Sequence, residues 1–208
     1  MAYLILVRHG QSEWNALGQW TGLTDVELTP EGQEEARQAA KHLKDIKIDK
    51  AHTSKLKRAK QTYLEISKSL NLAHIPLQEH HALNERDYGD LTGKNKWKIR
   101  EEYGEEKFKL WRRSWNHPVP GGETLEDVYN RAIPYYEKHI VKDLKEGKNI
   151  IIAAHGNTLR ALIKHLDRIS DEEISGIEVA TGEVHVYEID NKGKVVTKEI
   201  RGKKENVN

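Results

Sequence analysis

The chain has 208 residues, and its 34 basic and 33 acidic side chains leave a formal net charge of +1. This balance gives no overall electrostatic attraction to nucleic acid. Cysteine is absent, which excludes disulfides and thiolate metal sites. The mean hydropathy is −0.80, but the apolar residues recur in periodic segments. We therefore expect a single globular domain over residues 1–208 with a highly charged surface.

The first predicted element is a buried strand that ends in His-Gly. The segment Leu4–Gly10 carries an apolar run that ends at His9, and the same pattern recurs in Ile150–Gly156, where it ends at His155. Short β-branched runs bounded by glycine are typical of buried strands. If the two strands are parallel neighbours, both imidazoles emerge at the carboxyl edge of one sheet, where open α/β sheets bind ligands.

Helices and strands alternate after the first strand. Thr29 and Pro30 supply an N-cap hydroxyl and a proline in the first turn, which together predict the start of a helix. A short strand is expected near Ile48–His52, and Ser54 is a plausible cap for a second helix. Strand alternating with helix indicates an α/β fold.

Residues 75–122 form a stretch without clear periodicity, longer than an ordinary connection. It is rich in charge and glycine, and it holds three of the five tryptophans. The other two, Trp14 and Trp20, follow His9. Some of these rings could simply pack in the core. Their clustering favours a functional excursion, a lid that shuts water out of a site.

Regular structure resumes after the excursion. Thr124 and Asp127 resemble a capping box, and Pro134 should kink or restart the helix that follows. The apolar runs 184–189 and 195–200 flank a turn sequence and predict a closing hairpin. The tail from about residue 202 looks disordered.

The candidate site residues are weighed against ordinary structural roles. A lone buried histidine is usually a satisfied core residue, but Arg8 beside His9 could not be buried unpaired without a large penalty. Gly10 and Gly156 each remove a side chain where backbone would approach a ligand. Asn157 and the helix start after His155 would point amide donors at the same place.

Two further side chains fit a site that handles an anion. Arg58 falls in a first helical turn directly after a strand, where guanidinium and helix dipole add on one anion. By default Glu85 is a surface acid in a charged loop. A site lined with cations nevertheless needs a proton donor to a leaving oxygen, and no other carboxylate has a comparable context. His74, His80 and His81 lack metal-site spacing.

The segment Leu6–Asn15 resembles the signature of the histidine phosphatase superfamily, and within it the cofactor-dependent phosphoglycerate mutases. The resemblance covers essentially the whole chain. It continues through Thr21-Gly22, the Arg58 segment, Asn84-Glu85-Arg86, Tyr88-Gly89, Gly93, Asn95-Lys96, Trp111-Arg112-Arg113-Ser114 and Ala154-His155-Gly156-Asn157. The resemblance implies a three-layer α/β/α fold with a mixed, mostly parallel sheet.

The resemblance also implies a mechanism, the glycolytic and gluconeogenic interconversion of 2-phosphoglycerate and 3-phosphoglycerate. A phosphohistidine would form on His9, and Glu85 would act as general acid and base. Two sets of side chains would hold the ligand. The transferring phosphoryl oxygens would be held by Arg8, Arg58, Asn15 and His155. The carboxylate and second phosphate would be bound by Thr21, Gly22, Tyr88, Lys96, Arg112, Arg113, Gly156 and Asn157.

The implied cofactor is 2,3-bisphosphoglycerate, which primes the histidine, and no metal is needed. The partners would be small phosphorylated three-carbon acids, without nucleic acid or membrane. A cytoplasmic location is expected because no secretory signal or membrane span is seen. A monomer is plausible, and a homo-oligomer stays open.

Two alternatives to the mutase function are considered. Asp87 stands where mutases often carry histidine, and Pro120–Glu123 resembles phosphatase relatives. The nearest alternative is therefore a broad-specificity phosphomonoesterase on the same fold. A catalytically dead binding module is the other alternative, and retention of the catalytic set argues against it. The pair Arg112-Arg113 with Lys96 is the feature that favours a mutase, which must retain a doubly anionic intermediate.

Overall fold

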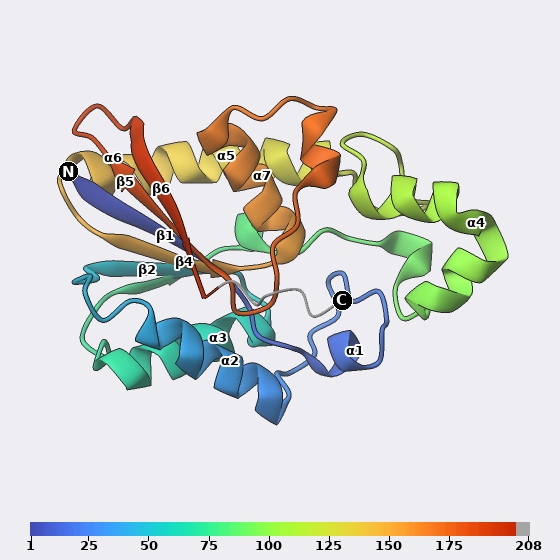
Figure 1. Ribbon diagram of the computed structural model, residues 1–208, viewed down its shortest axis with the longest axis horizontal. Coiled ribbons are helices and arrows are strands. Elements are labelled where there is room, and N and C mark those ends of the chain that lie inside the picture. Colours follow the sequence, from blue (N-terminus) through green and yellow to red (C-terminus); the bar gives the residue numbers. More distant parts are fainter. Residues whose placement is uncertain (203–208) are drawn as a thin grey trace.

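The computed structural model describes residues 1–202, and within them six strands form one mixed sheet in the order β3-β2-β4-β1-β5-β6 (Figure 1). The strands are β1 (Ala2–Arg8), β2 (Lys50–Thr53), β3 (Leu77–Glu79), β4 (Ile150–Ala154), β5 (Val184–Ile189) and β6 (Val195–Arg201). Strands β3, β2, β4 and β1 run parallel, and β5 and β6 are antiparallel to their neighbours. The predicted mixed, mostly parallel α/β sheet is confirmed.

Helices cover both faces of this sheet (Figure 1). The elements outside the sheet are α1 (Glu13–Ala16), α2 (Pro30–Lys41), α3 (Lys57–Leu70), α4 (Lys96–Arg113), α5 (Leu125–His139), α6 (Val141–Lys145) and α7 (Gly156–Asp167), with the short 3-10 turns η1 (His81–Leu83), η2 (Gly89–Leu91) and η3 (Glu173–Gly176).

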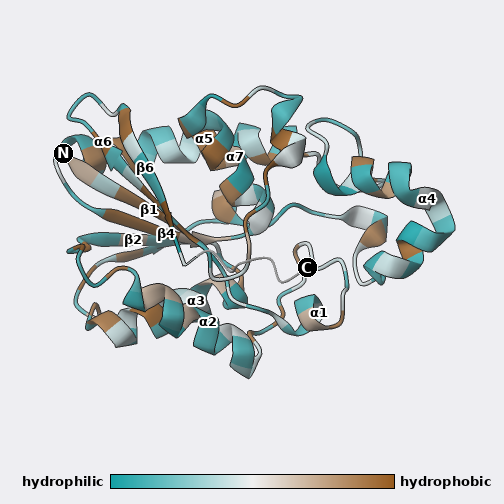
Figure 2. Ribbon diagram, viewed as in Figure 1, coloured by the Kyte–Doolittle hydropathy of each residue, from teal (hydrophilic) through white to brown (hydrophobic). Residues whose placement is uncertain are grey.

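The two faces follow from the alternation of side chains along the strands. Leu4 and Leu6 of β1 pack in the core formed with α5, α6 and α7. Ile5 and Val7 pack in the core formed with α2 and α3. Because successive strand residues point to opposite faces, the continuous apolar run of β1 requires helices on both sides. In Figure 2 the central strands β1 and β4 are coloured largely as hydrophobic, whereas the helices are mostly coloured as hydrophilic.

The first two long helices begin differently from each other. Thr29 caps α2 as predicted, since its Oγ1 accepts from the Gly32 amide at 3.1 Å. The predicted cap at Ser54 is wrong, because α3 begins at Lys57 with Leu56 at the N-cap and no side-chain cap bond. The Ser54 hydroxyl lies instead 2.7 Å from a ring nitrogen of His155.

The stretch 75–122 is more regular than its sequence suggests. β3 lies at the edge of the sheet, and α4 projects away from it (Figure 1). The stretch therefore contains two regular elements that the sequence did not predict. β3 has three residues that are not buried, and α4 buries few apolar side chains, so neither shows a clear period. Helix α4 breaks at Gly104, whose φ of 82° and ψ of 161° are non-helical.

A small separate core supports α4. It joins Trp20 to Leu91, Ile99, Phe108, Trp111 and Val119. Trp20 and Trp111 are 1% and 4% exposed, so the core-packing alternative is right for these two rings. Trp97 is 55% exposed. The tryptophans therefore do not form one water-excluding surface.

The C-terminal third confirms most of its predicted elements. Thr124 and Asp127 form a capping box at the start of α5, and β5 and β6 form the expected hairpin. Pro134 does not restart the helix, since α5 continues through it to His139 and the break comes at Ile140. The predicted disordered tail falls on residues 203–208, outside the described residues. No helix in residues 1–202 is long and apolar enough to cross a membrane.

Candidate active site

The two His-Gly motifs meet at the carboxyl edge of the sheet. β1 and β4 are parallel neighbours in which Arg8 pairs with Ala154, and the His9 amide donates to the Ala154 carbonyl at 2.9 Å. The rings of His9 and His155 are buried, with centroids 5.0 Å apart. The predicted convergence of the two imidazoles is therefore what the strand register produces.

The hydrogen bonds of His9 define its reactive nitrogen. Its Nδ1 lies 2.7 Å from the Gly10 carbonyl oxygen. A carbonyl can accept but cannot donate, so Nδ1 carries the hydrogen and the lone pair is on Nε2. Burial, followed by the positive charges of Arg58 and Arg8, holds the pKa of His9 well below 6.5. The ring is therefore neutral near pH 7 and can act as a nucleophile through Nε2.

The His155 ring is held by Ser54, the residue that directly follows β2. Its Nε2 lies 2.7 Å from Ser54 Oγ, which also accepts from the Leu56 amide. Burial, then the charge of Arg58, lowers its pKa well below 6.5. Its Nδ1 is buried and has no hydrogen-bond partner among residues 1–202. If Ser54 donates to Nε2, Nδ1 carries the hydrogen and can donate to an anion.

Two guanidinium groups flank the histidines. Arg58 is 1% exposed and donates to the carbonyls of Gly22 and Thr24, both at 2.8 Å. Burial lowers the pKa of Arg58 to about 10. Arg8 donates to the Val179 carbonyl at 2.5 Å. In the described part of the chain the Nε atoms of both arginines lack partners, which leaves each a buried donor suited to a phosphoryl oxygen.

The two carboxylate oxygens of Glu85 have different surroundings. Oε1 accepts from the Arg86 amide at 2.8 Å and from the amide and side-chain nitrogen of Asn157 at 3.2 and 3.1 Å. None of the described residues donates to Oε2. The Asn157 amide at the start of α7 therefore holds Glu85, and the binding role expected for Asn157 stays a prediction. Oε2 remains available for proton transfer.

The two glycines after the histidines serve different purposes. A Cβ at Gly10 would lie 2.0 Å from the Gly32 carbonyl oxygen, so this glycine allows close packing of backbone on α2. The expectation that Gly10 makes room for a ligand is wrong. A Cβ at Gly156 would lie 3.6 Å from the Arg8 guanidinium and 3.9 Å from Glu85 Oε2. Gly156 therefore keeps the space between these two groups open.

A second group of cations lies at the two ends of α4. Lys96 is the first residue of α4, and Arg112 and Arg113 are the last two. Burial, then the charge of Arg112, lowers the pKa of Lys96 to about 8. Burial, then the charge of Arg113, lowers the pKa of Arg112. In both cases burial is the main cause, and a neighbouring positive charge adds to it.

A cavity of about 80 Å³ is lined both by Arg8 and by this second group of cations. Its lining residues are Arg8, Trp20, Glu85, Tyr88, Lys96, Arg112, Arg113, Gly156, Asn157, Arg160, Glu178 and Val179. His9, His155 and Arg58 are not in that lining. Arg8 links the cavity to them, since its charge lowers the pKa of both histidines.

Three predicted binding residues lie outside this lining. Gly22 faces Tyr88, because a Cβ there would lie 3.2 Å from the Tyr88 amide nitrogen. Thr21 is buried next to it. Asn15 forms a capping box with Ser12 at the start of α1. The turn at residues 21–22 therefore adjoins the site. Asn15 has a structural role as a capping residue, and its role in binding stays a prediction.

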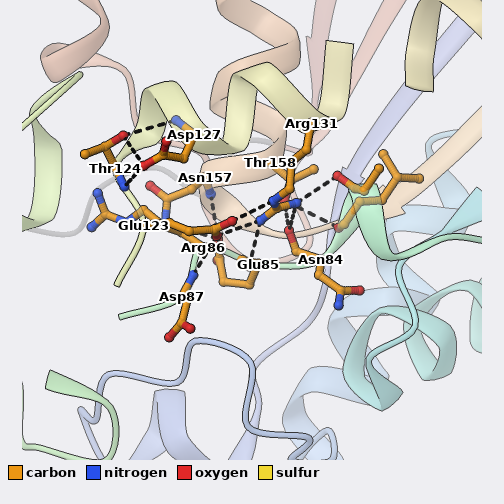
Figure 3. A network of polar contacts seen from close by, with 12 residues as sticks. Asn84, Glu85, Arg86, Asp87, Glu123, Thr124, Asp127, Arg131, Asn157 and Thr158 are labelled. Atoms are coloured by element: carbon orange, nitrogen blue, oxygen red, sulfur yellow. Dashed lines mark hydrogen bonds and ion pairs between the residues drawn. The ribbon is translucent and has the colours of Figure 1, made fainter. Parts of the chain in front are cut away.

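A network behind Glu85 fixes its segment (Figure 3). The Arg131 guanidinium of α5 donates to the carbonyls of Ala82, Asn84 and Glu85 at 2.8 to 3.0 Å. It also forms two bonds with the Glu123 carboxylate at 2.9 and 3.0 Å. Figure 3 shows this fork pointing at the backbone that carries Glu85. The position of the acid therefore depends on α5, far along the chain.

Several residues of the site were missed from the sequence. Arg86 lies over the Tyr88 ring at 4.5 Å and donates to the Trp111 carbonyl. Arg160 donates to Asn157 Oδ1 at 3.0 Å and to the Arg113 carbonyl at 2.7 Å. Arg160 lies three residues after Asn157, so the two side chains lie on the same face of the helix. This spacing could have identified Arg160 from the sequence. Glu178 gave no such signal.

Metal ligation was not predicted, and the described residues contain no group of three or more His, Asp or Glu side chains that could hold a metal ion. The imidazole of His80 instead stacks on Tyr135 with ring centroids 4.4 Å apart. This contact gives His80 a structural role.

Comparison with known proteins places the chain in a family. The sequence model of the histidine phosphatase superfamily (branch 1) matches residues 4–200. The chain belongs to this superfamily. It is 48% identical over 199 residues to a protein of Parvibaculum lavamentivorans named 2,3-bisphosphoglycerate-dependent phosphoglycerate mutase, with 95% of each chain covered. It is 50% identical to a protein of the same name from Cytophaga hutchinsonii, with 92% of this chain and 90% of that one covered.

Solved structures show the same fold. Bacillus stearothermophilus YhfR superposes with a TM-score of 0.83 at 25% identity, over 99% of this chain and 98% of that one. A mycobacterial glucosyl-3-phosphoglycerate phosphatase has a TM-score of 0.83 at 20% identity, over 97% and 98% of the two chains. The expected phosphoglycerate mutase-like architecture is confirmed.

Proposed function

We propose that the protein is a 2,3-bisphosphoglycerate-dependent phosphoglycerate mutase, which interconverts 3-phosphoglycerate and 2-phosphoglycerate. The observation that carries this proposal is one cavity with cations at both ends, Arg8 on the side of His9 and the Lys96, Arg112 and Arg113 group on the other. A phosphorylated acid has an anionic group for each end. Relatives at 42–50% identity that carry the mutase name support the proposal.

His9 is the phosphoryl carrier in this proposal. Its Nε2 forms a bond to phosphorus as the bond from phosphorus to the donor oxygen breaks. When bound, 2,3-bisphosphoglycerate would supply the phosphoryl group that primes this nitrogen. The unpartnered donors of Arg8, Arg58 and His155 suit its phosphoryl oxygens. Phosphoryl transfer depends mainly on such positioning and charge stabilisation.

Glu85 moves the proton. Its Oε2 gives a proton to the substrate oxygen that leaves phosphorus, and it takes a proton from the hydroxyl that attacks phosphohistidine in the reverse direction. Oε1 stays bonded to Asn157 and the Arg86 amide. The carboxylate can therefore exchange its proton without losing its orientation.

The second group of cations retains the intermediate. Lys96, Arg112 and Arg113 hold the carboxylate or the second phosphate while the three-carbon unit reorients. We also propose that the excursion over residues 75–122, which contains α4, acts as a lid over the part of the cavity lined by Lys96, Arg112 and Arg113. A cytoplasmic location and the oligomeric state stay predictions.

The decisive assay measures turnover of 3-phosphoglycerate with and without catalytic 2,3-bisphosphoglycerate, with free phosphate followed in parallel. A mutase requires the priming compound and releases little phosphate. Rapid phosphate release without 2-phosphoglycerate would instead identify the phosphomonoesterase, in which water takes the phosphoryl group from His9.

Removal of the second cation group sharpens the assay. We expect Arg112→Ala with Arg113→Ala to lower mutase turnover far more than hydrolysis of a small phosphomonoester. The small ester needs the His9 end of the cavity, so its rate should change less than about tenfold, roughly 1.4 kcal/mol. Arg100→Ala, an exposed arginine on the same helix, is the matched control. Equal losses in both activities would contradict a separate role for the pair.

A further inference from the structure

The carboxylate of Glu178 lies on the second group of cations. Its Oε1 is 2.5 Å from Arg113 Nη2 and 3.6 Å from Arg112 Nη2. These are the two arginines that the proposed function assigns to the second anionic group of the substrate. The protein's own anion therefore occupies the position that a ligand anion would take.

The backbone around Glu178 is anchored in the core, whereas its side chain is largely exposed. Val179 and Ile174 are 2% and 0% exposed and anchor the segment in the core. The Val179 carbonyl also accepts from Arg8 at 2.5 Å, so one short segment contacts both ends of the site. The Glu178 side chain is 60% exposed. It can rotate into solvent without moving the segment, since exposed ion pairs contribute little stability.

The small size of the cavity supports such a movement. Its volume is about 80 Å³, whereas ligand pockets are ordinarily about 300–1,000 Å³. Glu178 is part of its wall, beside Arg112 and Arg113. A ligand anion on these arginines would meet a like charge unless the carboxylate leaves. Displacement of Glu178 therefore both opens the cavity and frees the two guanidinium groups.

We propose that Glu178 is an internal competitor for the second anion site, whose carboxylate must be displaced by phosphoglycerate and which thereby sets the affinity for doubly anionic ligands. This inference rests on the proposed function for the identity of the ligand. Weaker binding of the doubly anionic ligand in both of its orientations suits a mutase. Binding that is equally tighter for substrate and transition state lowers KM without accelerating the chemical step. An intermediate bound too tightly would also exchange orientation slowly.

The test compares Glu178→Gln with Glu172→Gln, an exposed glutamate six positions earlier in the same segment that does not contact the arginine pair. Calorimetry measures binding of 3-phosphoglycerate and of inorganic phosphate to the unphosphorylated protein. We expect Glu178→Gln to tighten binding of 3-phosphoglycerate about three- to tenfold, and its KM to fall in parallel. Inorganic phosphate, which has no second anionic group, should bind within about twofold of wild type. Glu172→Gln should resemble wild type with both ligands.

Two results would overturn the proposal. If Glu178 merely holds the arginines in place, the Gln variant binds 3-phosphoglycerate more weakly and melts at a lower temperature. If the ion pair is incidental, the two variants behave alike. Failure of the proposed function is a separate result, because it appears as absent 2-phosphoglycerate formation by the wild-type protein. The binding comparison then still decides whether Glu178 competes with anions.

Discussion

At the scale of single residues, hydrogen bonds give two similar atoms of one side chain different tasks. His9 Nδ1 is bonded to the Gly10 carbonyl, which directs the lone pair to Nε2. Glu85 Oε1 is bonded to three donors, which leaves Oε2 for the substrate. In both cases a backbone group of the next residue helps to fix the side chain. The atom to which the proposed function assigns the chemistry is therefore positioned before any ligand arrives, which lowers the cost of reaching the transition state.

The role of His9 can be tested directly. We expect His9→Ala to abolish acid-labile labelling by 2,3-bisphosphoglycerate and to lower turnover by at least about 10³-fold, because no second nitrogen is placed for attack. Labelling is measured with a radioactive phosphoryl group after rapid quenching. His155→Ala is the control, since it should slow labelling without preventing it. Persistent labelling of His9→Ala would transfer the role to another residue.

At the scale of elements, the break in α4 is what assembles the second group of cations. A straight helix of 18 residues would be about 27 Å long and would hold its two ends apart. The break at Gly104 folds the helix back, so that Lys96 and Arg112 line one cavity. The two limbs of α4 are visible in Figure 1. A single backbone conformation therefore controls the distance between the cations.

The break predicts a specific effect of Gly104→Ala. The φ of 82° with ψ of 161° is a conformation that alanine strongly disfavours, at a cost of about 1–3 kcal/mol. We expect kcat/KM for 3-phosphoglycerate to fall at least about tenfold, while hydrolysis of a small phosphomonoester changes little. Gly147→Ala is a matched control, since Gly147 has φ of 84° and open space around it but lies beyond α6. Equal activity losses in both variants would contradict this account.

At the scale of the whole molecule, the stability of the fold depends on keeping buried imidazoles neutral. His52 of β2 is 0% exposed, and its Nδ1 lies 2.8 Å from the Tyr135 hydroxyl. Burial, then the charge of Lys50, lowers its pKa to about 4. The unfolded chain takes up this proton near pH 6.5 and the folded chain near pH 4. The stabilisation is therefore complete above pH 6.5 and is lost as the pH falls toward 4.

We expect this histidine to contribute roughly 3 kcal/mol to the loss of unfolding free energy between pH 6.5 and 4. His52→Gln, which keeps a polar partner for Tyr135 but cannot take up a proton, should show a correspondingly shallower pH dependence. Denaturant unfolding at a series of pH values measures the difference. His74→Gln, an exposed histidine, is the control. Parallel curves for wild type and His52→Gln would show that His52 does not couple folding to protonation.

The sequence by itself determined the parts of this protein that depend on neighbours along the chain. The two apolar strands that end before His-Gly, the Thr29 cap, the Thr124–Asp127 capping box and the closing hairpin are local patterns, and all are present in the structure. The family resemblance added the fold, which similar solved structures confirm. The roles of individual site residues stay predictions, although most of those residues line or adjoin one cavity.

The tertiary structure decided what depends on contacts between distant segments. Ser54 is used by His155, 101 positions away, and so does not cap a helix. Glu178 reaches Arg113 across 65 positions, and no periodicity marks it. In the sequence, Gly104 is one glycine in a charged stretch. Its role in bringing Lys96 and Arg112 to the same cavity is visible only in the folded helix. Local propensity describes a few neighbouring residues, whereas these contacts exist because the packed sheet and helices bring remote side chains together.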